Sequence, residues 1–139
     1  MFIWKLKPIL TAEIDIPTFV KKSKKARLSS VWIKVADGEV AYENIRDSMA
    51  ATFKSVRDAL AAERIGIWGW HVPHGLDTPT AAKEAKLVAK IARRFGLAGI
   101  LMDAEAEANF FRGTEAEASL YRLFAACIAR YSWQDTRDL

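Results

Sequence analysis

The sequence lacks several features that would place it in a well-marked class. It has a single cysteine, Cys127, so neither an intrachain disulfide nor a cysteine-rich metal site can form. It contains no run of about 18 apolar residues, so we expect no membrane-spanning segment. The first residues do not form a signal-peptide pattern, and we therefore expect a cytoplasmic protein.

The glycine-rich motifs that cradle phosphates are also missing. Neither G-x-x-x-x-G-K-[ST] nor G-x-G-x-x-G occurs, and there is no G-x-S-x-G nucleophile turn. We accordingly expect no cofactor. The formal net charge is +4, and part of the excess comes from a basic run at residues 21–27. We interpret this run as a solvated helix face and do not expect the protein to bind nucleic acid.

Four apolar runs are present, and each is followed by a segment of helical periodicity. The runs cover residues 2–6, 31–36, 66–72 and 99–103. They recur at intervals of roughly 30 to 35 residues, the alternation typical of βαβ units and a parallel sheet. Because the later runs do not alternate cleanly between apolar and polar residues, we expect strands that are covered on both faces.

The helices between these strands have recognisable boundaries. Residues 16–26 form the first predicted helix, with Asp15 as its N-cap and Pro17 in its first turn. Residues 45–60 carry one apolar stripe. A third helix begins at Thr78 and stops before Gly96, and a last one opens with the capping-box pair Thr114 and Glu117.

Four βα units supply about half of a (β/α)8 barrel, which needs roughly 200 to 250 residues. We therefore predict an α/β fold in which residues 1–139 form a single half-barrel domain. Half a barrel leaves an inner face carrying several tryptophans uncovered, so we expect self-association, most simply a homodimer that closes the barrel. Two alternatives stay open: a flattened, doubly wound sheet, and a piece of a longer ancestor that associates in another way.

Asp103 and Glu105 are the best candidates for chemistry. Ligands of parallel α/β folds bind at the carboxyl ends of the strands. Residues two apart on a strand point to the same face, so the Cβ atoms of the two residues would lie about 7 Å apart. Such a pair can divide labour, with one carboxyl protonating a leaving oxygen while the other stays ionised. The alternative is that both are ordinary acidic residues of a solvated loop.

Further candidates lie on the second and third predicted strands. Trp68 and Trp70 could stack on sugar rings, although for either one taken singly a place in the core or under a helix is the favoured interpretation. Lys34 is a charged residue within an apolar strand and could face Asp103 or Glu105, or could reach water from near the strand end. The remaining substrate-binding candidates end these two strands; they are Asp37 and His71.

A metal site is the less favoured interpretation of the same edge. His71 and His74 frame a proline, and together with Asp103 and Glu105 they could ligate a divalent ion. The H-x-x-H spacing in a loop is unspecific, and we expect no metal.

The ordered set of motifs over residues 28–107 resembles the first half of glycoside-hydrolase TIM barrels. The runs VWIKVADG, GIWGWH and GILMDAE are closest in layout to family 25 lysozyme-like barrels, and GILMDAE is also similar to the chitinase-type signature D-G-x-D-x-D-x-E. The resemblance implies that Glu105 is the proton donor and that Asp103 assists it. This chain has no Asp in residues 2–6, where family 25 barrels usually carry one, and it lacks the later strands that complete the sugar site in both families.

These patterns favour a glycoside-hydrolase-like protein that binds or cleaves a polysaccharide, peptidoglycan or chitin-like, with cleavage depending on a second chain. A non-catalytic interaction module derived from a barrel is the first alternative. A metal-dependent hydrolase that uses His71, His74, Asp103 and Glu105 is the second.

Overall fold

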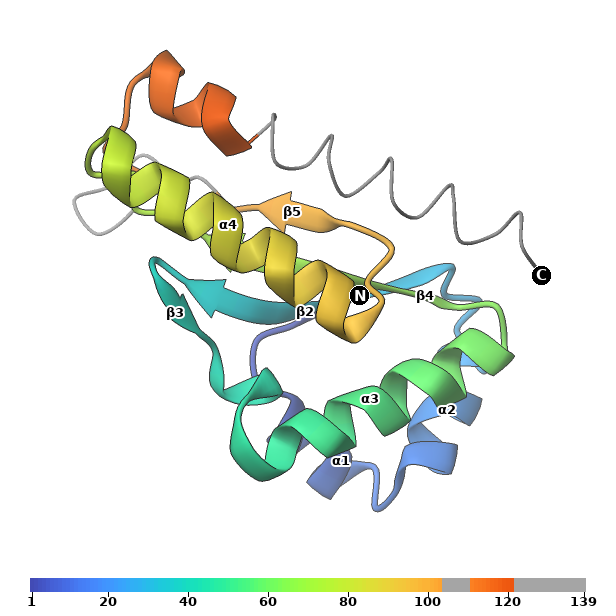
Figure 1. Ribbon diagram of the computed structural model, residues 1–139. Coiled ribbons are helices and arrows are strands. Elements are labelled where there is room, and N and C mark those ends of the chain that lie inside the picture. Colours follow the sequence, from blue (N-terminus) through green and yellow to red (C-terminus); the bar gives the residue numbers. More distant parts are fainter. Residues whose placement is uncertain (104–110, 122–139) are drawn as a thin grey trace, which may run out of the picture.

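The computed structural model describes residues 1–103 and 111–121 (Figure 1). The elements follow the order β1 (Phe2–Ile3), α1 (Leu6–Ala12), α2 (Ile16–Lys25), β2 (Ser30–Asp37), β3 (Val40–Ala41), the 3-10 helix η1 (Glu43–Ile45), α3 (Asp47–Ala62), β4 (Gly66–Val72), α4 (Thr78–Phe95) and β5 (Ile100–Met102). Residues 115–121 are also helical.

The sheet is parallel and its strands follow chain order. Its order is β1-β2-β4-β5, with every neighbouring pair parallel, and the short β3 pairs antiparallel with β2. Trp32 lies opposite Trp68, and Lys34 lies opposite Trp70. The predicted parallel α/β fold is therefore confirmed. The order shows no reversal among the described strands, whereas a doubly wound sheet reverses at its switch point.

The helices pack on one face of this sheet. Val31, Ile33 and Val35 alternate along β2 and are fully buried, because α2, α3 and α4 cover them. The helical members of this core share apolar character and come from all three helices; they are Phe19, Val20, Phe53, Val56, Leu60, Val88, Ile91, Ala92 and Phe95.

The opposite face carries an aromatic ladder. The rings of Phe2 and Trp32 stack with centroids 5.6 Å apart, and those of Trp32 and Trp68 stack at 4.7 Å. The ladder ends against Gly99, where a Cβ would overlap the Trp68 ring. Because neighbouring strands are about 4.8 Å apart, rings stacked this closely face one another across the strands.

The helix boundaries follow the sequence signals. The Asp15 side chain accepts a hydrogen bond from the Thr18 N–H at 2.7 Å, and Gly96 ends α4 with φ +58. The Thr114 N–H donates to Glu117 Oε2 at 2.8 Å, which is the predicted capping box. The side-chain hydroxyls of Thr114 and Thr78 also donate to Glu117, and together with this backbone contact they lower its pKa to about 2.

Two local features differ from the prediction. The strand predicted over residues 2–6 ends at Ile3, and α1 begins at Leu6. The turn between them is held by Asn44, which accepts from the Leu6 N–H and donates to the carbonyls of Trp4 and Lys34. The hairpin between β2 and β3 was not predicted; it turns at Gly38, with φ +51.

Candidate functional site

The carboxyl ends of β2, β4 and β5 meet at one edge of the sheet, as expected for parallel strands. Asp37 ends β2, His71 and Val72 end β4, and Asp103 directly follows β5. Register pairs connect these ends, since Asp37 lies opposite Val72, and His71 opposite Met102. We call this region the carboxyl edge.

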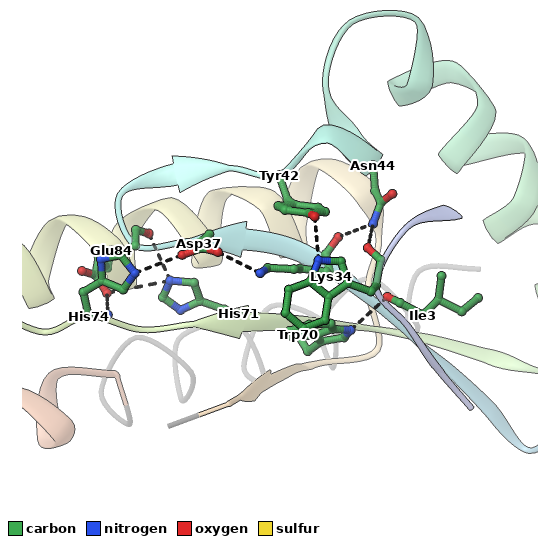
Figure 2. Close-up of polar contacts among 11 residues, drawn as sticks. Ile3, Lys34, Asp37, Tyr42, Asn44, Trp70, His71, His74 and Glu84 are labelled. Carbon is green, nitrogen blue, oxygen red and sulfur yellow. Dashed lines mark hydrogen bonds and ion pairs between the residues drawn. The ribbon is translucent and has the colours of Figure 1, made fainter. Parts of the chain in front are cut away.

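Lys34 is buried inside a cage of aromatic rings at this edge (Figure 2). The residue is only 1% exposed, and its Nζ lies 4.2 Å from the ring centroid of Trp4, 4.6 Å from that of Tyr42 and 5.1 Å from that of Trp70. Ring faces are electron-rich and attract an ammonium group. The cage therefore holds a positive charge beneath aromatic surface, and we call it the lysine cage.

The partner of Lys34 is Asp37, which also binds His74. Lys34 Nζ donates to Asp37 Oδ2 at 2.8 Å, and His74 Nε2 donates to Oδ1 at 3.0 Å. Figure 2 shows the Asp37 carboxylate between the Lys34 amine and the His74 ring. The sequence analysis considered Asp103 or Glu105 as the partner of Lys34, whereas the structure pairs Lys34 with Asp37. A bulge between Lys34 and Ala36 shifts the register of β2 just before Asp37.

The electrostatics of this arrangement keep Asp37 ionised. Partial burial by itself would raise the pKa of Asp37, but the hydrogen bonds and charges of Lys34 and His74 outweigh it and hold the pKa below its ordinary value. The side chains of Asp37 and His74 remain 41% and 39% exposed. The carboxyl edge thus presents a fixed, ionised acceptor to solvent.

Gly38 makes room for the His74 ring. A Cβ at Gly38 would lie 2.8 Å from His74 Nδ1, and the backbone there is in the left-handed region with φ +51. We predict that Gly38→Ala lowers the free energy of unfolding by about 1–2 kcal/mol from backbone strain alone, and displaces His74 from Asp37. Gly66→Ala is the control, because a Cβ at Gly66 would make only ordinary contacts at 3.8 Å or more. Equal urea midpoints for the two variants would contradict this interpretation.

A second polar group, which sequence reasoning missed, lies behind the edge. Glu84 of α4 is fully buried and accepts from the N–H groups of His74 at 3.0 Å and Gly75 at 3.2 Å. The Tyr121 hydroxyl donates to Glu84 at 2.6 Å, and burial together with this carboxylate raises the pKa of Tyr121. We call these contacts the Glu84 cluster. They fix the loop that carries His74.

His71 lies beside the Glu84 cluster and is neutral. Its Nε2 donates to the Gly38 carbonyl at 3.1 Å, and it has no exposed surface. Burial lowers the pKa of His71 to about 4, against the weaker opposing effects of the Gly38 carbonyl and of Glu84. Its Nδ1 makes no hydrogen bond within the described part of the chain.

The depressed pKa of His71 predicts a loss of stability in acid. An unfolded His binds a proton below about pH 6.5, whereas the folded one does so only near pH 4, so between these values the unfolded state binds more protons. His71 should therefore destabilise the fold by about 3 kcal/mol as the pH falls from 7 to 4. Urea titrations across this range should show a steeper decline for the native protein than for His71→Gln. Parallel declines would argue against a neutral His71.

The two tryptophans predicted to bind sugar, Trp68 and Trp70, both pack against other aromatic rings. Trp70 is 4% exposed, forms a wall of the lysine cage and donates from Nε1 to the Ile3 carbonyl at 3.1 Å. The Trp68 ring stacks on the Trp32 ring, and Gly99 lies so close to it that a Cβ there would overlap the ring. Trp4, which the sequence predicted inside a strand, lies in the turn between β1 and α1. It is 57% exposed, and its Nε1 donates to the Tyr42 hydroxyl at 2.7 Å.

The predicted acidic pair is described only in part. Asp103 is partly buried, and its N–H donates to the His71 carbonyl at 2.9 Å, which extends the pairing of β5 with β4. Glu105 lies outside the described residues, so the roles assigned to the pair stay predictions. Within residues 1–103 and 111–121, no three His, Cys, Asp or Glu side chains are placed to hold a metal ion.

The chain was compared with protein-family models, with curated proteins and with solved structures, and no match was found. No helix in the described part of the chain has the length and apolar character needed to cross a bilayer.

Proposed function

We propose that the protein binds a carbohydrate, peptidoglycan or chitin-like, at the carboxyl edge, as a glycoside-hydrolase-like domain. The observation that carries the proposal is the exposed indole of Trp4, anchored over Lys34 beside the ionised Asp37. Sugar sites pair an aromatic surface for the apolar side of the ring with polar groups for its hydroxyls.

Trp4 is suited to stacking because its orientation is already fixed. The Tyr42 hydroxyl holds its Nε1, the Lys34 ammonium lies against its ring, and Trp70 meets it edge-to-face with centroids 5.4 Å apart. More than half of the residue nevertheless faces solvent. A ring held in this way loses little conformational freedom when a ligand binds.

Asp37 and His74 supply the polar part of the proposed site. A carboxylate that is ionised and partly exposed accepts hydrogen bonds from sugar hydroxyls, and such charge-assisted bonds are stronger than neutral ones. Lys34 reaches both Asp37 and the Trp4 ring, so a single buried cation links the stacking surface to the acceptor.

Hydrolysis is a further part of the proposal and requires a closed barrel. Support comes from the strand order and from the helices on one face, which is the arrangement of each half of a (β/α)8 barrel. A second copy would close the barrel as a homodimer and cover the aromatic ladder. In that assembly Glu105 would be the proton donor and Asp103 would assist it.

Calorimetric titration with chitotetraose and with a muropeptide tests the binding proposal. We expect Asp37→Asn to weaken binding about tenfold, the loss typical of one charge-assisted hydrogen bond. Asp58→Asn is the control, because Asp58 pairs with Arg57 on the exposed surface of α3. Absence of binding to either sugar by the native protein would contradict the proposal. Glu105→Gln separates the two parts, since it should abolish the release of reducing ends and retain binding.

A further inference from the structure

We propose a second binding site, for a small organic anion with an apolar body, in the groove between the start of α3 and the second half of α4. The groove encloses about 440 Å³, within the range of small-molecule sites. It adjoins the helix-covered core, whereas the carbohydrate site proposed above lies at the carboxyl edge. The two proposals therefore stand or fall independently.

The floor of the groove is apolar. Ile45, Ile91 and Phe95 line it from the core and are almost fully buried, and partly buried Ala50 and Leu87 extend it outward. This floor would accept an aliphatic or aromatic body, because apolar ligand surface gains free energy when it leaves water.

The rim of the groove is mainly cationic. Arg46, Lys90 and Arg94 line it and are exposed, and Asp47 contributes the one carboxylate among the lining residues. Lys90 and Arg94 are four residues apart on α4 and therefore lie on the same helix face, where like charges repel.

Within the described part of the chain, these three cations take part in no ion pair. Elsewhere on the described surface, Lys24 and Lys83 pair with Glu63 and Glu39 at 2.5 and 3.7 Å. No ion pair joins Arg46, Lys90 or Arg94 to a carboxylate of the described residues. The Arg94 guanidinium instead lies 5.3 Å from the ring centroid of Phe95, directly above the floor. A carboxylate, sulfonate or phosphate head would relieve the repulsion while its body covers the floor.

Fluorescence titration with 8-anilinonaphthalene-1-sulfonate tests the site, with N-phenyl-1-naphthylamine as the same body without the charged head. We expect the sulfonate to bind at least tenfold more tightly than the neutral compound. Hexyl phosphate and hexanoate should displace it at lower concentrations than inorganic phosphate does. Equal affinity for the charged and neutral probes would overturn the proposal, as would a lack of displacement by the two alkyl anions.

Substitutions locate the bound probe. Because the rim side chains are exposed, the double variant Lys90→Gln/Arg94→Gln should keep the native melting temperature while the Kd for the sulfonate rises at least tenfold. Arg93→Gln removes one positive charge at the neighbouring position, which does not line the groove, and should leave Kd unchanged. Equal effects of the double variant and of Arg93→Gln would show only general charge attraction and would overturn the assignment.

Discussion

Replacing Glu84 with alanine is expected to lower the free energy of unfolding by about 4 kcal/mol, one of the two largest effects that the structure predicts. Glu84 is fully buried and accepts three hydrogen bonds, from the His74 and Gly75 N–H groups and from the Tyr121 hydroxyl. Alanine would leave these donors without an acceptor in a region closed to water. Urea unfolding at pH 7 measures the loss.

Two companion variants show whether the loss belongs to the buried carboxylate. Glu84→Gln keeps one acceptor oxygen and should lose roughly half as much stability as the alanine variant. Glu115→Ala removes an exposed carboxylate and should change stability by less than about 0.5 kcal/mol. A Glu84→Ala loss no larger than that of Glu115→Ala would contradict the role given to the Glu84 cluster.

Replacing Trp4 with alanine is expected to weaken carbohydrate binding by about 2 kcal/mol, or roughly thirtyfold in Kd. The reason is that Trp4 supplies the exposed stacking surface of the proposed site, whereas Trp68 is partly buried and stacks on Trp32. Trp4→Phe keeps a ring over Lys34 and should lose less. Calorimetric titration with chitotetraose measures both variants.

Phe2 provides a matched control for the Trp4 experiment. It is 63% exposed and stacks on Trp32 at the outer end of the aromatic ladder; of the lysine-cage rings it contacts Trp70, with centroids 6.5 Å apart. Phe2→Leu should therefore leave Kd unchanged. If Phe2→Leu weakened binding thirtyfold while Trp4→Ala kept a Kd close to native, the carbohydrate would bind at the aromatic ladder and not at Trp4.

Much of the fold could be predicted because its signals are local. An apolar run with helical periodicity on either side needs no distant information, and the boundary signals at Asp15, Gly96 and Thr114 act within one helical turn. The turn at Trp4 depends instead on Asn44, forty residues away, whose side chain satisfies three backbone groups. No local pattern signals such a contact.

The site was predictable only in outline, for the same reason. The position of Lys34 and Asp37 near the end of an apolar strand marked them as candidates, but their pairing depends on a bulge that the sequence does not signal. Glu84 looks like any acidic residue of an Ala- and Glu-rich helix, and its burial follows from where Tyr121 and the His74 loop pack. Ring orientation, which separates Trp4 from Trp68, is a property of the packed structure.

The most direct test of the central claim is to follow the indole N–H signals of the protein by nuclear magnetic resonance while chitotetraose is added. Binding at the carboxyl edge predicts that the Trp4 signal shifts progressively and saturates, together with the ring signals of His74. The Trp32 and Trp68 signals should stay in place, because these rings stack within the ladder. Saturable shifts confined to Trp32 and Trp68, or no shifts in any indole, would contradict a carbohydrate site built on Trp4 and Asp37.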